Sequence, residues 1–144
     1  MSKFNAQQFE ADTTPQQRTY SKWDKYDGYV TESLESGDGA IVLADGFLNP
    51  DFKNRECIGK EFWLIGYGCR IADMADDCLS CVLVDEDYNT YSTISNGVAT
   101  VITKWISAGV KPSFDHKIRV RYEEGGYGMR KYYTLKWVKN YGTD

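Results

Sequence analysis

Residues 60–71 read Lys60-Glu61-Phe62-Trp63-Leu64-Ile65-Gly66-Tyr67-Gly68-Cys69-Arg70-Ile71. The stretch is rich in aromatic and β-branched residues and lies between Gly59 and Asp73, a pattern typical of a strand. Glycine inside a strand often marks a bulge or a tight bend, so Gly66 and Gly68 predict a strand that turns a corner. A bent first strand, followed by a hairpin, a helix and a second hairpin, favours a small closed barrel.

The residues that follow supply the other parts of such a barrel. The predicted elements are strands over residues 78–84, 90–95, 116–123 and 129–139 and a helix over residues 97–108. Apolar residues of the helix recur with the spacing of a single stripe. Asn96 is its expected N-cap, and Trp105 is expected in the core. This order predicts a mainly β protein, a five-stranded OB-fold Greek-key barrel with one capping helix and an N-terminal extension.

The first 40 residues are predicted to form that extension, as an arm before a single barrel domain over residues 41–144. Aromatic residues recur three apart at Tyr20, Trp23, Tyr26 and Tyr29, which places them along one side of a short helix or turn. This row either packs onto the barrel or docks a partner protein, and packing is favoured. The apolar run at residues 40–44 is predicted to be a buried extra strand.

The composition is that of a single globular domain, with 144 residues, 42% hydrophobic and 26% charged. No apolar run reaches the ~18 residues of a membrane helix, and the first residues lack the apolar core of a signal peptide. We therefore expect a cytoplasmic protein with reduced cysteines, in the host cytoplasm if it is viral. Residues 1–103 carry eight Lys and Arg against 17 acidic residues, and residues 104–144 carry nine against four. The basic last quarter favours a polyanionic partner.

The predicted final hairpin combines cations with aromatic rings. Single-stranded nucleic acid needs both, because cations contact its phosphates and aromatic faces stack on its unpaired bases. The candidate binding residues of the hairpin are Lys117, Arg119, Arg121, Tyr122, Tyr127, Arg130, Lys131, Tyr132 and Lys136. The loop at residues 125–128 is expected to present Tyr127 outward. Tyr67, Arg70 and Tyr91 are predicted to extend the same surface, and Trp63 is either core or a further platform. The alternative is a solvated hairpin whose cations prevent edge-to-edge aggregation.

Other chemistries have weaker support. Cys78 and Cys81 have the spacing of zinc ligands, but Cys57 and Cys69 do not form a second such pair. Acidic residues at 73, 76 and 77 and at 85–87 could hold a divalent ion in a nuclease, although neither cluster has the spacing of a calcium loop. His116 has no fixed Ser or Cys partner for a catalytic triad. We expect no cofactor, no metal and no enzymatic activity.

The chain resembles the small OB-fold single-stranded-DNA-binding proteins of bacteriophages over residues 58–139. The resemblance rests on Gly59-Lys60-Glu61-Phe62-Trp63-Leu64-Ile65-Gly66-Tyr67, Val82-Leu83-Val84-Asp85 and Thr90-Tyr91-Ser92-Thr93. It implies binding of unpaired DNA without catalysis, in replication or recombination, with proteins of those processes as further partners. The binding face that it implies is Tyr67, Arg70, Tyr91, Arg119, Arg121, Tyr127, Arg130 and Tyr132. Many such proteins end in an acidic recruiting tail, whereas this chain ends Lys139-Asn140-Tyr141-Gly142-Thr143-Asp144.

Sequence-tolerant binding of single-stranded DNA is thus the main hypothesis. The alternative is a protein-interaction module, such as a viral inhibitor or an accessory subunit, which the acidic N-terminal part and its aromatic row favour. A metal-dependent nuclease is the third hypothesis. The sequence leaves the oligomeric state and the choice between DNA and RNA open.

Overall fold

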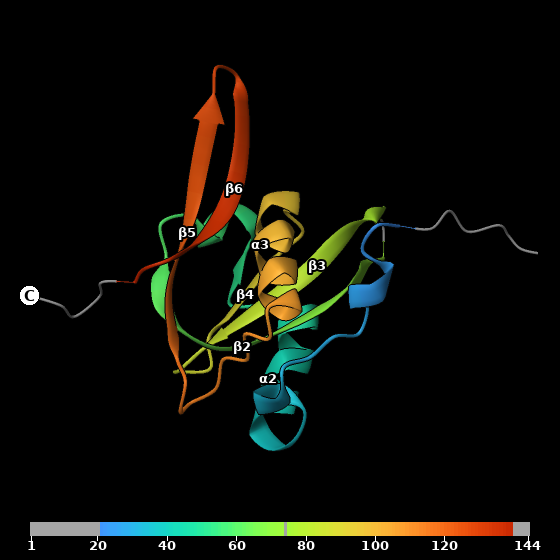
Figure 1. Cartoon of the computed structure of the whole chain (residues 1–144), viewed down its shortest axis with the longest axis vertical. Helices are drawn as coiled ribbons and strands as arrows, with labels where there is room; N and C mark the ends of the chain where they lie inside the picture. The colour runs from blue at the N-terminus through green and yellow to red at the C-terminus, as the bar shows by residue number, and fades with distance from the viewer. Residues whose placement is uncertain (1–20, 74, 140–144) are drawn as a thin grey trace, which may run out of the picture.

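A curled β-sheet with helices on its two faces forms the body of the protein (Figure 1). The computed structural model describes residues 21–73 and 75–139. In sheet order, the strands are β1 (Phe52–Lys53), β4 (Thr90–Thr93), β3 (Ala75–Asp85), β2 (Glu61–Ala72), β5 (Ile118–Tyr127) and β6 (Arg130–Trp137). The helices are α2 (Gly37–Leu48) and α3 (Asn96–Ser107), with short 3₁₀ helices at Asp24–Tyr26, Glu32–Leu34 and Asn54–Cys57. No helix in these residues is long and apolar enough to cross a membrane.

β2 is the central strand, as the sequence predicts. It pairs antiparallel with β5 through its first residues and with β3 over the rest of its length. The register with β3 shifts between Leu64 and Gly66, so that Ile65 is an extra residue in β2. A bulge of this kind bends a strand and increases its twist. The predicted corner is therefore confirmed, and it lies where β2 changes its main partner.

The two glycines of β2 also allow other segments to approach the strand. A Cβ atom on Gly66 would lie 2.6 Å from Ser33 Oγ, and one on Gly68 would lie 2.8 Å from Leu43. Both distances are too short for non-bonded heavy atoms. A larger residue at either position would require these side chains to move.

The sheet separates two cores, because successive residues of a strand point to opposite faces. The inner core lies under α3 and includes Phe62, Leu64, Tyr67, Cys69, Leu79, Cys81, Leu83, Tyr91, Val98, Ala99, Ile102, Val120, Tyr122 and Leu135. The smaller outer core lies under α2 and consists of Leu34, Leu43, Ile65, Val82 and Val84. We call the α3 side of the sheet its inner face and the α2 side its outer face.

α2 replaces the buried strand predicted at residues 40–44, so that prediction is wrong. A short, continuously apolar run cannot be assigned to strand or helix by periodicity alone. In the structure, Gly39 and Gly46 are buried on the side of α2 that faces the protein, and Gly46 lies against Val82 of the sheet. Residue 41, where the barrel domain was expected to begin, lies inside α2.

α3 confirms the helix predicted over residues 97–108 within one residue. Its N-cap is Ser95 and not Asn96, because the Ser95 hydroxyl accepts a hydrogen bond from the Val98 backbone N–H at 3.3 Å. Asn96 is already the first helical residue and its side chain is exposed. Trp105 is partly buried and packs at the edge of the inner core rather than in its centre.

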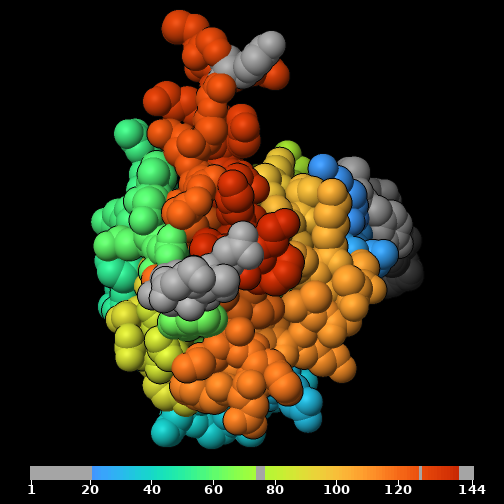
Figure 2. All heavy atoms as spheres, turned by 60° about the vertical axis from the view of Figure 1, so that its left-hand side comes forward, coloured from blue at the N-terminus to red at the C-terminus, as the bar shows by residue number. Residues whose placement is uncertain are grey.

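The hairpin of β5 and β6 is longer than the sequence predicts. The two strands stay paired as far as Tyr127 and Arg130, and Gly125 and Gly126 are ladder residues opposite Tyr132 and Lys131. The predicted loop over residues 125–128 is therefore wrong. The connection is a tight turn at residues 128–129, in which Gly128 has a φ of 64°. The end of the hairpin projects from the body of the protein (Figures 1 and 2).

The aromatic row of the N-terminal part packs onto the body. Trp23 is buried in the inner core, and Tyr26 and Tyr29 pack against that core. The Trp23 indole N–H also donates to the Asp77 carbonyl oxygen at 3.0 Å. The favoured packing interpretation is confirmed for these three residues, while Tyr20 lies outside the described residues.

The edge strands of the sheet, β1 and β6, show how far the sheet closes into a barrel. β4 pairs with β3 on one side and, in parallel, with β1 on the other, where Phe52 stacks on Tyr91 at 5.1 Å. In the described part of the chain, β6 pairs with β5 alone. The predicted mainly β fold, with a helix between two hairpins, is confirmed. The sheet itself has six strands and curls into a half-barrel instead of the closed five-stranded barrel that was expected.

Candidate nucleic-acid interface

Charged and aromatic side chains gather on the outer face of β2, β5 and β6. Residues paired across an antiparallel sheet point to the same face, and here Trp63 pairs with Arg119, and Glu61 and Lys136 both pair with Arg121. Their neighbours Phe62, Val120 and Tyr122 point inward and are buried. We call this surface the hairpin face, and its residues are Glu61, Trp63, Arg119, Arg121, Glu123, Tyr132, Thr134 and Lys136.

Two arginines of the hairpin face share one carboxylate. Arg119 Nε lies 3.1 Å from Glu61 Oε2, and Arg121 NH1 lies 3.1 Å from Glu61 Oε1. Arg121 Nε also lies 2.7 Å from Glu123 Oε2. The hydrogen bonds from Arg119 and Arg121 hold the pKa of Glu61 below its usual range. The arginines are thus held in place across two strands, but a phosphate would have to compete with Glu61 for them.

Trp63 provides a flat ring beside these cations. The guanidinium carbon of Arg119 lies 5.4 Å from the centre of the Trp63 ring, and Lys117 Nζ lies 5.9 Å from it. Such distances allow cation–π attraction. Lys117 also forms an ion pair with Glu86 at 2.8 Å. Trp63 is half-buried on the outer face, and the alternation of Glu61 and Trp63 with the buried Phe62 and Leu64 is the signal that could have assigned it.

Tyr132 is an exposed aromatic residue of the projecting hairpin. Its side chain is 55% exposed, and its ring lies over Gly125, where no side chain would fit. Arg130 and Met129 follow at the hairpin end, and Met129 is 99% exposed. A ring held over a glycine in a paired strand is a suitable stacking surface for an unpaired base.

For three predicted site residues the surface position is wrong, because their rings lie in the inner core. Tyr67 and Tyr122 are fully buried and Tyr91 is 5% exposed. The Tyr67 hydroxyl donates to the Val110 carbonyl oxygen at 2.8 Å, and the Tyr122 hydroxyl lies 2.8 Å from Thr93 Oγ1. Burial raises the pKa of Tyr122 to about 12. No base can stack on these rings without opening the core, so they stabilise the fold.

Two further predicted residues lie away from the hairpin face. Arg70 is on the α2 side of the sheet, with its guanidinium carbon 4.3 Å from the centre of the Phe47 ring. Lys131 pairs with Gly126 and so points to the inner side of the hairpin. There its Nζ atom lies 3.8 Å from Oε1 of Glu124. The backbone of Tyr127 is opposite Arg130 at the end of β5, and its side chain is outside what the structure describes.

The cysteines and acidic residues considered for metal binding do not gather into a site in the described residues. Within residues 21–73 and 75–139 there is no group of three or more His, Cys, Asp or Glu side chains that could hold a metal ion. Cys69 and Cys81 are paired across β2 and β3 in the inner core, with their sulfur atoms 3.8 Å apart. Cys78, the other residue of the predicted zinc spacing, is half-exposed.

Asp85, from the second acidic cluster, organises the turn between β3 and β4. Its carboxylate accepts hydrogen bonds from the backbone N–H groups of Asp87 and Asn89, both at 2.9 Å. It also accepts from the Asn89 side-chain amide at 3.1 Å and from the Tyr91 hydroxyl at 2.7 Å. The carboxylate is 4% exposed and occupied by these donors, so it is a structural group.

Comparison of the chain with protein-family models, with curated protein sequences and with solved structures found no match.

Proposed function

We propose that this protein binds single-stranded DNA with little sequence preference through the hairpin face. The observation that carries the proposal is that two partly exposed arginines, the half-buried Trp63 and the exposed Lys136 and Tyr132 share one surface that continues along a projecting hairpin. Cations for phosphates and flat rings for bases are the requirements of single-strand binding. The function needs no catalytic group.

The connectivity of the sheet supports the same proposal. β2 pairs with both β3 and β5, and α3 connects β4 to β5, an order that is compatible with the OB-fold that we propose. OB-folds bind oligonucleotides on their second and third strands and in the loop between the last two. Here α2 packs on the outer face of β3 through Val82 and Val84. The hairpin of β5 and β6 is therefore the binding element that we propose.

The test is fluorescence anisotropy with a labelled dT oligomer of about 30 nucleotides, long enough for several binding sites. We expect affinity that falls with salt, and a salt slope reduced by about 0.7 for each phosphate contact that Arg119→Ala or Arg121→Ala removes. Tyr132→Ala should weaken binding by about 1–3 kcal/mol through lost stacking. Lys104→Ala, an exposed cation on α3, is the control and should bind like the wild type.

Glu61→Gln provides a test in the opposite direction. It removes the carboxylate that holds Arg119 and Arg121, so the variant should bind the oligomer more tightly at low salt. Glu32→Gln, an exposed residue of a 3₁₀ helix, is its matched control. No binding of the oligomer at low salt, or equal binding by all of these variants, would overturn the proposal.

A protein-interaction module is the second candidate function. The aromatic row does not support it in the described residues, since Trp23, Tyr26 and Tyr29 pack on the body. The observation that favours it is an exposed apolar face on α2, which includes Leu48 at 81% exposure. Recovery of one stoichiometric protein in a pull-down, undisturbed by excess oligonucleotide, would favour this function over DNA binding.

A further inference from the structure

α2 is apolar on more than one side, yet the structure covers only one of them. The helix reads Gly-Asp-Gly-Ala-Ile-Val-Leu-Ala-Asp-Gly-Phe-Leu over residues 37–48 and contains no Lys or Arg. A helix with apolar residues all round is normally buried all round. Here Gly39, Leu43 and Gly46 face the protein, and the opposite side is left in solvent.

The uncovered side forms a continuous apolar ridge. Ile41, Ala44 and Leu48 are spaced three and four residues apart, which places them in one row along the helix. Ile41 is 63% exposed and Leu48 is 81% exposed. Single exposed apolar residues need no explanation, but a row of them beside a groove marks an interaction surface.

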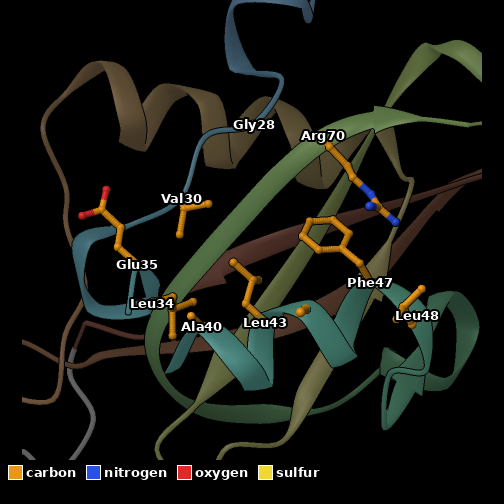
Figure 3. A pocket seen from close by; sticks show the side chains of 10 residues that line it. Gly28, Val30, Leu34, Glu35, Ala40, Leu43, Phe47, Leu48 and Arg70 are labelled. Atoms are coloured by element: carbon orange, nitrogen blue, oxygen red, sulfur yellow. The ribbon is translucent and has the colours of Figure 1, made fainter. Parts of the chain in front are cut away.

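A groove of about 600 Å³ runs along one flank of this ridge (Figure 3). It lies between α2, the segment before it and β2, and its apolar walls include Val30, Leu34, Leu43 and Phe47. The ridge and the groove therefore lie side by side along α2, on the same surface of the protein. A second apolar surface that covers the ridge would cover the groove as well.

The charges of the groove are separated along the helix. Glu35 lies near the N-terminal end of α2, and Arg70 lies over Phe47 near its C-terminal end (Figure 3). Neither residue forms an ion pair with another residue of the described chain. The two acidic residues of α2 itself, Asp38 and Asp45, do not line this groove.

We infer that this surface binds a second copy of the chain, with the two α2 helices antiparallel about a twofold axis. In that arrangement the ridges of the two copies pack along each other and the two grooves face each other, and Ala44 lies near the axis, where a small residue lets the helices approach. A twofold axis also brings Arg70 of one copy to Glu35 of the other, and does so twice, because the interface uses the same patch on both copies. The charge pattern of the groove is thus complementary to that of a second copy in this orientation. The surface is separate from the hairpin face, and the inference does not depend on DNA binding.

The first test is sedimentation velocity of the full chain over a range of protein concentrations, without nucleic acid. The wild type should convert from monomer to dimer as its concentration rises. Leu48→Asp should raise the dimer dissociation constant by at least about tenfold, since it places a charge in the apolar interface. Met129→Asp changes an exposed apolar residue at the hairpin end and should dimerise like the wild type.

The second test exchanges the charges. Arg70→Glu and Glu35→Arg should each weaken the dimer, because each sets like charges opposite each other at both ends of the interface. The double variant Arg70→Glu/Glu35→Arg restores both pairs and should dimerise more tightly than either single variant. Circular dichroism of each variant verifies that the fold is retained. A wild type that stays monomeric at ~100 μM, or a double variant no better than the single ones, would overturn the inference.

Discussion

At the scale of single residues, burial decided the role of side chains whose chemistry allows two roles. Tyr67, Tyr91 and Tyr122 have the same ring and hydroxyl as Tyr132, but only Tyr132 is on the surface. A tyrosine suits a core position when its hydroxyl finds a partner, and it suits a binding surface equally well. The sequence analysis left the role of Trp63 open, although the alternation at Phe62, Trp63 and Leu64 carried the signal for its face. The residues near the bulge gave no such pattern.

Asp85 illustrates the same point for an acidic residue, and it leads to a prediction. Asp85→Ala should lower the free energy of unfolding by about 3 kcal/mol, because buried donors from Asn89 and Tyr91 would lose a charged acceptor. Urea unfolding followed by circular dichroism measures the change. Asp87→Ala, in the same turn but exposed, should have little effect. A similar loss in both variants would contradict the structural role given to Asp85.

At the scale of elements, the sequence predicted those whose pattern extends over many residues. The amphipathic stripe of α3 and the alternation of β5 identify them without knowledge of their neighbours. α2 was assigned wrongly because its apolar residues fit both a strand and a helix, and the contact of Gly46 with the sheet decides between them. The end of the β5–β6 hairpin was assigned as loop because glycine is common in loops, whereas Gly125 in fact lies under the Tyr132 ring.

The cap of α3 provides a prediction at this scale. Ser95→Ala should destabilise the protein by about 1 kcal/mol, because it removes the acceptor for the Val98 N–H at the start of the helix. Asn96→Ala should change stability by much less, since Asn96 is exposed within the first turn. Thermal and urea unfolding of the two variants compare them directly. If Asn96→Ala were the more damaging change, the cap would be Asn96 after all.

At the scale of the whole molecule, ion pairs join strands that are distant in sequence. Glu61 of β2 contacts Arg119 and Arg121 of β5, and these contacts lower the pKa of its carboxyl group. A lowered pKa in the folded state means that the contribution to stability is present above the unfolded value of about 4.3 and is lost as the pH falls through the folded value.

The prediction from this coupling concerns unfolding in acid. As the pH falls below about 4.3, the melting temperature of the wild type should fall more steeply than that of Glu61→Gln, which has no carboxylate to protonate. Glu32→Gln should follow the wild type. Differential scanning calorimetry at several pH values and constant ionic strength gives the three slopes. Equal slopes for the wild type and Glu61→Gln would show that the ion pairs contribute nothing measurable.

The sequence by itself determined the mainly β class, the central bent strand, α3 and the alternating faces of β5. These follow from local periodicity and from glycine, which act within a few residues of chain. Only the tertiary structure decided that β1 extends the sheet beyond β4, that α2 covers its outer face and that Arg70 lies apart from Arg119 and Arg121. Each of these depends on contacts between segments far apart in sequence, which no local pattern encodes.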